Sequence, residues 1–204
     1  MKSGTAEWHK ERAKRLTASD FGAALGLNPY CSRQKLWRIK TGIESVEENF
    51  HIQRGNEHEA DAIFCYEMET GLLVDEVGMV CHPAHDWIAC TPDGTVGSDG
   101  LVETKCPAQF RDEPPVYHMA QIQGQLECVG RAWCDYVQWV DGEIRITRVT
   151  RNAAWWEWAL PQLREFWGYV ERMEEPPRRG KADKALADAM PAELAGIVEE
   201  TTGA

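Results

Sequence analysis

The clearest alternation of hydrophobic and polar residues runs from Leu101 to Cys106 and predicts a β-strand. Just before it, residues 91–94 read TPDG, which predicts a tight reversal because proline presets one backbone angle and Asp-Gly closes the turn. The Asp-Gly pair at 141–142 predicts a β-hairpin. Further strands are expected at 72–81, 86–91, 132–140 and 143–150.

Helices are predicted where apolar residues recur at spacings of three and four and where glycine or a capping residue marks an end. They are expected at 6–15, 19–25, 32–41, 50–70, 114–129 and after Asn152. Ser19 is the expected N-cap of its helix. In the helix 50–70, the expected buried stripe consists of Ala60, Ile63, Phe64 and Met68, which places Glu59 close to the core side.

The order of these elements predicts an α/β fold with a central mixed β-sheet flanked by helices. At 204 residues the chain suits one domain with a substantial core. We assign residues 1–175 to that domain and 176–204 to an acidic, alanine-rich C-terminal extension, expected to be a weak helix or a mobile tail. No apolar run reaches the roughly 18 residues of a membrane span, and the N-terminus lacks an apolar signal core. A cytoplasmic protein without a membrane segment is expected.

The charge of the chain is unevenly distributed. The net charge of −11 argues against general nucleic-acid binding, because neutralising phosphates requires lysine and arginine. Acidic residues gather at 44–48 and near the C-terminus, whereas the segment 10–40 carries eight lysines and arginines. This basic segment can offer a local surface to DNA while the remainder repels it.

The seven cysteines are an odd number, and no Cys-x-x-Cys pair occurs among them. Neither a zinc knuckle nor a redox pair is therefore signalled. Cys81, His82, His85 and Cys90 are acceptable zinc ligands, but their spacing matches no standard motif. A zinc-binding structural module stays open as an alternative.

Three candidate catalytic side chains converge around the strand at 101–106. Glu103 and Lys105 share a face of that strand because residues two apart point the same way, and the reversal brings Asp93 to the same end. Two carboxylates about 4 Å apart repel each other by roughly 4 kcal/mol at an effective dielectric near 20. A retained proton or a divalent cation relieves this, and hard oxygen ligands suit Mg²⁺. Lys105 would then orient or activate water for phosphodiester hydrolysis; the alternative is a solvated hairpin with a Glu–Lys pair.

Pro92-Asp93 followed by Glu103-x-Lys105 resembles the PD-(D/E)XK nuclease signature. Its neighbours strengthen the match: WHxxR at 8–12, LTAS at 16–19, GxxxE at 55–59, LVETKCP at 101–107 and MAQIQ at 119–123. Together these segments resemble the phage lambda exonuclease and YqaJ-type viral recombinase family over roughly residues 6–175. The resemblance implies a restriction-endonuclease-like core, which agrees with the α/β prediction.

The resemblance also implies an activity. It implies a Mg²⁺-dependent 5′-to-3′ exonuclease, with Mn²⁺ as a substitute, that degrades one strand from double-stranded DNA ends to mononucleotides. The 3′ single strands left behind serve phage-type recombination. A homotrimer and a single-strand annealing protein as partner are implied in the same way.

Residue roles follow from the matched motifs. Asp93 and Glu103 would hold the metal with the backbone carbonyl of Thr104. The resemblance adds Glu59 and Gln121 to the catalytic site and assigns DNA and 5′-phosphate contacts to Arg12, Ser19, Thr91 and His118. His118 stands where the lambda enzyme more usually has tyrosine, so a phosphate contact, a helper acid and simple packing are all open for it.

Two further alternatives remain. One is another nuclease of the same superfamily, such as a nicking endonuclease or a RecB-like module. The other is a catalytically idle DNA-binding recombination scaffold, against which the intact set of Asp93, Glu103 and Lys105 argues.

Overall fold

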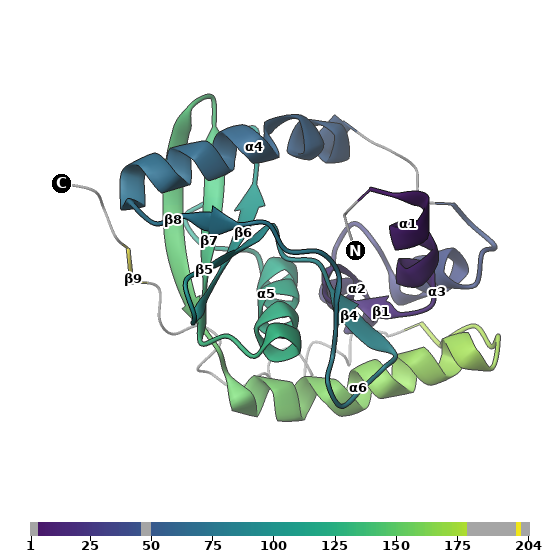
Figure 1. Cartoon of the computed structure of the whole chain (residues 1–204). Helices are drawn as coiled ribbons and strands as arrows, with labels where there is room; N and C mark the ends of the chain where they lie inside the picture. The colour runs from purple at the N-terminus through teal and green to yellow at the C-terminus, as the bar shows by residue number, and fades with distance from the viewer. Residues whose placement is uncertain (1–3, 46–49, 179–198, 201–204) are drawn as a thin grey trace.

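The computed structural model describes residues 4–45, 50–178 and 199–200. It contains a larger mixed sheet with strand order β2-β5-β6-β7-β8-β9 (Figure 1). Only β6 and β7 pair in parallel within it, and the other neighbours are antiparallel. The strands are β2 (Val74–Asp75), β5 (Gly94–Val96), β6 (Gly100–Lys105), β7 (Trp133–Val140), β8 (Glu143–Thr150) and β9 (Glu199–Glu200).

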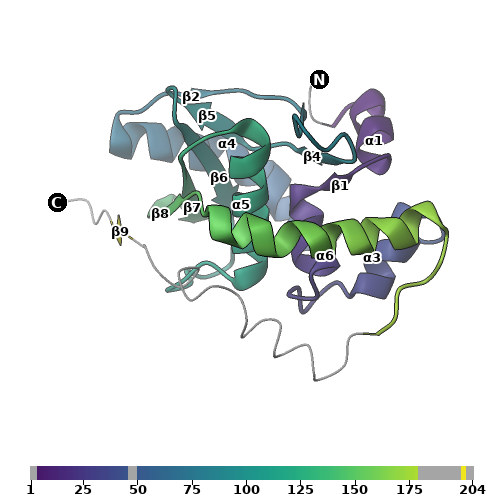
Figure 2. The ribbon, with the colours of Figure 1, turned by 90° about the horizontal axis from the view of Figure 1, so that it is seen from below.

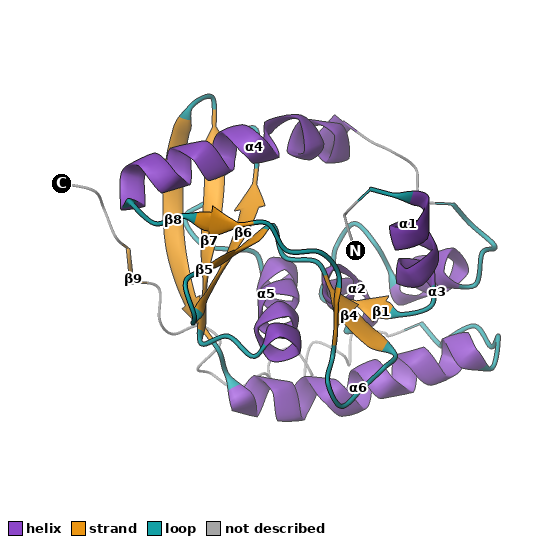
Figure 3. Cartoon of the chain, in the orientation of Figure 1, coloured by secondary structure: helices purple, strands orange, loops and turns teal. Residues whose placement is uncertain are grey.

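A second, small sheet lies beside the helices of the N-terminal part (Figure 3). Its order is β1 (Leu16–Thr17), β4 (Ile88–Cys90) and β3 (Val80–Cys81), with β1 and β4 parallel. The strand predicted at 72–81 is therefore two strands, β2 and β3, in different sheets. The chain passes from β4 directly into the 91–94 reversal and the larger sheet, so that reversal joins the two sheets.

The helices cover both faces of the larger sheet. They are α1 (Ala6–Ala13), the 3₁₀ turn Ala18–Asp20, α2 (Phe21–Ala24), α3 (Arg33–Lys40), α4 (Phe50–Thr70), α5 (Val116–Val129) and α6 (Ala153–Glu171). Seen from below, α6 runs across α5, α2 and α3 as the outermost layer (Figure 2). Among the described residues, no helix is long and apolar enough to cross a membrane. The predicted α/β fold with a mixed sheet flanked by helices is confirmed.

The alternation of β6 assigns its side chains to two separate cores. Leu101 packs with Ile122 and Leu126 of α5, whereas Val102 packs with Tyr66 of α4. Because residues two apart share a face, Glu103 follows Leu101 to the α5 side of the sheet. A third core joins α2, α3, α5 and α6.

Gly100 fixes the register at the start of the parallel pair. It lies opposite Trp133 of β7, and a Cβ atom at this position would come within 2.3 Å of the Trp133 ring. The indole can pack this closely only against a residue without a side chain.

A hydrogen bond from Tyr66 to a buried carboxylate holds α4 to the sheet on the face opposite α5. Asp135 of β7 is 1% exposed, and the Tyr66 hydroxyl of α4 donates a 2.7 Å hydrogen bond to its Oδ2. Arg148 of β8 donates to both carboxylate oxygens, at 2.8 and 2.9 Å. The Arg148 guanidinium also lies 3.8 Å above the centre of the Trp133 ring.

The predicted buried stripe of α4 is wrong. Phe64 is 62% exposed and Met68 is 71% exposed, Ala60 is exposed as well, and only Ile63 of the stripe is half-buried. Glu59, expected close to the core side, is exposed. The helix instead turns Ala62 and Tyr66 to the sheet, both fully buried. Tyr66 takes this position because its hydroxyl reaches Asp135, a partner distant in sequence.

The remaining boundaries agree with the predictions to within a few residues. Asn152 caps α6, its side chain accepting a 3.0 Å hydrogen bond from the Trp155 amide. Ser32 caps α3 in the same way, at 3.1 Å from the Lys35 amide. Of the C-terminal extension predicted at 176–204, residues 179–198 and 201–204 lie outside the described part, as do residues 46–49 of the acidic loop.

Candidate active site

Glu103 lies at the centre of a hydrogen-bonded cluster between β6 and α5. Its side chain is 2% exposed. The amide Nε2 of Gln121 donates to Oε1 at 2.6 Å, and Nε2 of Gln125 donates to Oε2, also at 2.6 Å. The Lys105 ammonium forms a close ion pair with Oε1. Each carboxylate oxygen therefore has its own amide donor, and one of them also has a positive charge beside it.

The local sequence of α5 explains why two glutamines reach one carboxylate. Gln121 and Gln125 are four residues apart and lie one turn from each other on the same helix face. Gly124 lets this helix approach its neighbour closely, because a Cβ there would come within 2.5 Å of the Phe21 ring. The helix ends at Gly130, which has the left-handed φ of 71°.

Asp93 reaches the same strand from the reversal. Its Oδ2 accepts hydrogen bonds from the Thr104 backbone amide and hydroxyl, both at 2.7 Å. Desolvation and the nearby Glu103 charge raise the pKa of Asp93 to about 8. A divalent cation would favour the ionised form that these neighbours disfavour.

Lys105 is held as an ammonium ion. Burial alone would lower its pKa, but the Glu103 and Asp93 carboxylates outweigh burial and raise the pKa above the ordinary value. A lysine with a raised pKa is a poor base. Of the two predicted roles, the structure therefore favours orienting water and offsetting charge over removing a proton.

Glu59 approaches from α4. Desolvation and the Glu103 charge raise its pKa, although Lys105 opposes the shift. Among the described residues, no three histidine, cysteine, aspartate or glutamate side chains are arranged as a ready metal cage. The donors present, carboxylates with backbone carbonyls and room for water, fit a cation such as Mg²⁺ that keeps several of its waters.

A cavity of about 190 Å³ connects these residues with the N-terminal segment. Its wall includes Arg12, Ser19, Glu59, Thr91, Asp93 and Gln121. Glu103 and Lys105 are not in this wall, but Glu103 is bonded directly to Gln121, which is. A larger cavity of about 780 Å³ lies between α3 and residues 175–178, and neither Asp93 nor Glu59 lines it.

Arg12 and Ser19 form a polar pair at one end of the smaller cavity. Arg12 Nη2 donates a 2.6 Å hydrogen bond to Ser19 Oγ, and the guanidinium lies 5.0 Å from the centre of the Trp8 ring. Trp8 Nε1 in turn donates to Thr91 Oγ1 at 3.1 Å. Arg12 is thus linked through Trp8 to the reversal that carries Asp93.

The prediction that Ser19 caps a helix is wrong. Ser19 lies inside the 3₁₀ turn, and the capping interaction belongs to Thr17 and Asp20. The Asp20 carboxylate accepts from the Thr17 amide at 3.0 Å and pairs with Lys40 at 2.6 Å. Since these residues supply the cap, the Ser19 hydroxyl is available to Arg12.

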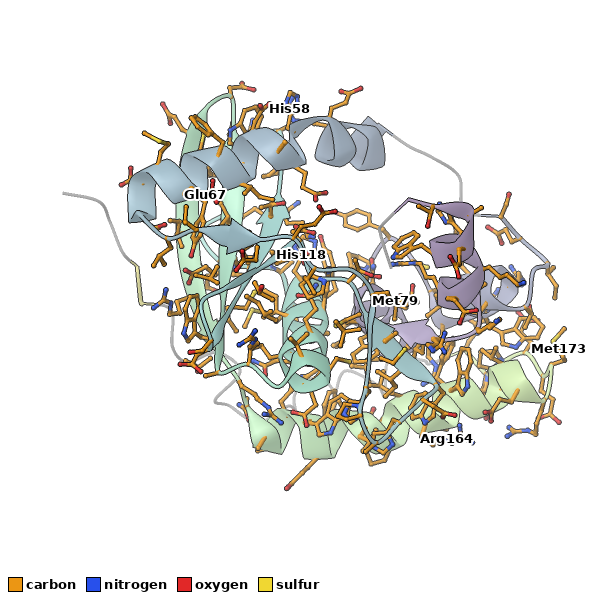
Figure 4. All side chains as sticks on the ribbon, in the orientation of Figure 1. His58, Glu67, Met79, His118, Arg164 and Met173 are labelled. Carbon is orange, nitrogen blue, oxygen red and sulfur yellow. The ribbon has the colours of Figure 1, made fainter. Side chains whose placement is uncertain are left out.

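His118 lies in the first turn of α5, at the upper end of this helix in Figure 4. Its Nδ1 is 2.8 Å from the Tyr136 hydroxyl, and it is not in the wall of the smaller cavity. Burial, together with Lys105 and Arg111, lowers the pKa of His118 to about 2. His118 is therefore neutral, which favours a packing role over the proposed acid; a DNA contact by this residue stays a prediction.

The zinc alternative is not supported. The seven cysteines, all described, are free, and in the described part of the chain no cluster of potential zinc ligands is found. His82 instead stacks on Trp156, with ring centroids 5.3 Å apart, and Cys81 is exposed.

Two contributors to the cluster were missing from the predicted site. Gln125 contacts Glu103 directly, and its spacing of four from Gln121 was the signal that could have identified it. Trp8 stands in a recognisable motif, but its bond to Thr91 spans 83 residues, and no local pattern indicates it.

Comparisons with known proteins identify the family and the fold of this chain. Residues 7–132 match the model of the YqaJ-like viral recombinase domain. The fold is similar to an alkaline exonuclease, LHK-Exo, from Laribacter hongkongensis, with TM-score 0.74, 29% identity, and coverage of 90% of this chain and 97% of that one. The same enzyme in complex with dAMP gives TM-score 0.75 and 29% identity over 90% of this chain and 99% of that one.

Two more distant matches complete the comparison. A phage-related exonuclease from Haemophilus somnus shares the fold, with TM-score 0.59, 14% identity, and coverage of 85% of this chain and 96% of that one. An uncharacterized protein of Acanthamoeba polyphaga mimivirus is 27% identical in an alignment of 154 residues. The match covers 65% of this chain and only 28% of that protein's length. The family match covers more than half of the sequence, and the chain therefore belongs to the YqaJ-like viral recombinase domain family.

Proposed function

We propose that this protein is a Mg²⁺-dependent exonuclease that degrades one strand of duplex DNA from its 5′ end and releases mononucleotides. The family and the alkaline exonuclease neighbour support a phage-type exonuclease. The observation that carries the finer proposal is the shared cavity, whose wall joins the Arg12–Ser19 pair to Asp93, Glu59 and Gln121. The end of the cavity with Arg12 and Ser19 offers hydrogen-bond donors that suit a phosphate. The end with Asp93 and Glu59 offers carboxylates that suit a cation.

The Arg12–Ser19 pair would bind the terminal 5′-phosphate. A guanidinium donates charge-assisted hydrogen bonds to phosphate oxygens, and the Ser19 hydroxyl already lies 2.6 Å from it. In this proposal, Thr91 holds Trp8 and thereby orients Arg12. The cavity, of about 190 Å³, connects the residues proposed to bind the terminal phosphate with those proposed for hydrolysis. This short connection supports release of short products. The neighbour solved with dAMP is consistent with a nucleotide in such a site.

The hydrolytic step uses the carboxylate end of the cavity. Asp93 and Glu103, with the Thr104 carbonyl, would hold the divalent cation, which supplies Lewis-acid activation when bound. Gln121 and Gln125 keep Glu103 in place. The Lys105 ammonium offsets negative charge that grows on the scissile phosphate, and Glu59 completes the anionic wall. We propose a homotrimer and a single-strand annealing partner on the family resemblance alone.

Digestion of linear duplexes tests this proposal. Substrates labelled at either terminus, with a 5′-phosphate or a 5′-hydroxyl, are incubated with Mg²⁺, Mn²⁺ or EDTA. We expect metal-dependent release of mononucleotides from 5′-phosphorylated ends and intact 3′ strands. Nicking of circular DNA would instead indicate an endonuclease, and DNA binding without any cleavage would indicate an idle scaffold.

The matched variants are Arg12→Ala and Arg38→Ala. Arg12 lines the smaller cavity, whereas Arg38 is an exposed arginine of α3 that pairs with Glu175 and does not line that cavity. Arg12→Ala should reduce the preference for phosphorylated ends about tenfold, as expected for one charge-assisted contact, and Arg38→Ala should leave that preference unchanged. Equal digestion of phosphate and hydroxyl ends by the parent protein would contradict the role of Arg12.

A further inference from the structure

The side-chain carbonyl of Gln125 has no partner within the described protein. Gln125 is 1% exposed, its Nε2 donates to Glu103, and its Oε1 is buried without a hydrogen bond. Buried polar atoms are nearly always bonded to protein or to ordered water. An acceptor left open at this depth indicates a donor outside the described part of the polypeptide.

The chemistry of the neighbours fixes the orientation of this amide. A carboxylate paired with a lysine accepts hydrogen bonds and does not donate them. The Gln125 atom that lies 2.6 Å from Glu103 Oε2 must therefore be the NH₂ group. A flipped amide would place two acceptors against each other, so the open atom is the carbonyl oxygen.

The surroundings of Gln125 indicate the missing donor. Gln125 lines the same cavity as Asp93 and Glu59, and at about 190 Å³ this cavity is large enough for water. A hard divalent cation keeps several waters when proteins bind it. Those waters donate strongly and need acceptors around them. A neutral carbonyl provides one without adding to the charge of the carboxylates.

We infer that Gln125 is a positioning residue with two functions at the cation site: its amide holds Glu103, and its carbonyl accepts a hydrogen bond from a water in the cation's hydration shell. This inference rests on the proposed metal-dependent function. Gln125 differs from Gln121 because its carbonyl is buried and unpaired. Loss of Gln125 should therefore weaken binding of the cation, and it should slow hydrolysis only as a consequence of that weaker binding.

The test measures metal binding without DNA. Mg²⁺ is titrated by calorimetry into the full-length protein and into Gln125→Met, which keeps the length of the side chain and removes both hydrogen bonds. Residues that orient metal ligands typically change affinity by about 10- to 100-fold, so we expect the Mg²⁺ dissociation constant to rise by about that factor. Circular dichroism confirms that each protein is folded.

Gln123→Met is the matched control. Gln123 lies two residues away on the same helix and is 3% exposed. Both ends of its amide are bonded to backbone, to the Thr150 carbonyl and the Asn152 amide, each at 2.8 Å. Gln123→Met should lower the melting temperature and leave the Mg²⁺ dissociation constant unchanged.

Two results would overturn the inference. One is a Gln125→Met protein that binds Mg²⁺ within twofold of the parent. The other is a crystal structure of the Mg²⁺-loaded parent in which a protein donor occupies Gln125 Oε1 in place of water; this second measurement applies even if the variant fails to fold. Failure of the parent itself to bind any divalent cation would instead reject the proposed metal-dependent function, and this inference with it.

Discussion

Glu103 and Asp135 are acids at the same depth on neighbouring strands, yet they differ in almost every other respect. Both are nearly inaccessible, at 2% and 1% exposed. Asp135 faces α4, where one arginine contacts both of its oxygens and a tyrosine adds a third donor. Glu103 faces α5, where two neutral amides hold it and a single ammonium lies beside one oxygen.

The difference lies in the charge balance around each acid. The charge of Asp135 is matched by the guanidinium of Arg148, which contacts both of its oxygens. Glu103 shares Lys105 with Asp93, and the Glu59 charge acts on Asp93. Amides fix the position of a carboxylate without neutralising it, so the α5 side keeps negative charge for a cation. Depth of burial alone therefore does not distinguish a structural acid from a candidate catalytic one.

The largest effect is expected from Glu103→Gln. The amide keeps the shape but removes the charge that would hold the cation and pair with Lys105. We expect the single-turnover rate on labelled duplex to fall about 1,000-fold or more, comparable to loss of a principal electrostatic group. Losing the pair with Lys105 costs stability, but removing the charge also relieves the repulsion on Asp93, so the urea midpoint should change less than in Asp135→Asn. Near-normal turnover would disprove the assignment of Glu103.

Asp135→Asn should have the opposite profile. Removing one member of a buried ion pair costs about 3 to 5 kcal/mol, and because Arg148 is partly exposed to water we expect about 2 to 4 kcal/mol here. Urea denaturation measures this loss. The hydrolysis rate per folded molecule should be close to that of the parent, and a hundredfold loss of rate with unchanged stability would refute the structural role of Asp135.

The free energy of unfolding should depend on pH through Asp93, on the side of the sheet that carries Glu103. Desolvation and Glu103 raise the pKa of Asp93 from 3.8 to about 8 in the metal-free protein. Between about pH 4 and pH 8, Asp93 therefore keeps its proton in the folded protein but has lost it in the unfolded chain. The free energy of unfolding consequently falls as the pH rises through this range. Urea denaturation in EDTA at successive pH values measures the slope.

Two comparisons test whether Asp93 is responsible for that slope. Asp93→Asn should flatten it, because the amide does not titrate. Mg²⁺ should flatten it too, because a cation can replace the proton. An unchanged slope in Asp93→Asn would assign the pH dependence to another group.

The smallest effect is expected from Tyr66→Phe. It removes one donor from Asp135 and leaves the two arginine bonds intact. A single buried hydrogen bond contributes about 1 kcal/mol, so the free energy of unfolding should fall by about that amount with no change in hydrolysis. A loss as large as that of Asp135→Asn would mean that the tyrosine, not the arginine, stabilises the carboxylate.

Local chemistry predicted most elements of the fold. The hairpin at Asp141-Gly142, the strand carrying Glu103 and the helix ends at glycine all follow from turn and capping preferences. The same alternation predicted that Glu103 and Lys105 share a face, and the structure shows them in contact. Their catalytic roles stay predictions.

Long-range pairing is what the sequence could not reveal. The buried face of α4 depends on Tyr66 reaching Asp135, and periodicity alone favoured the larger apolar side chains Phe64 and Met68. Similarly, Ser19 has a side chain suited to capping a helix, but Thr17 and Asp20 form the cap in the structure. The ion pair between Asp20 and Lys40, a residue distant in sequence, accompanies this arrangement.

The absence of a side chain at Gly100 has a consequence for how β6 could evolve. The glycine fits under the Trp133 indole only in the observed alignment of β6 with β7. Sliding β6 by one residue would invert every side chain along it, sending the glutamate into the α4 core and a valine toward the glutamines. The missing side chain at the start of this inner strand thus fixes the alignment on which the position of Glu103 depends, and variation at Gly100 should be tolerated least in sequences that keep the tryptophan.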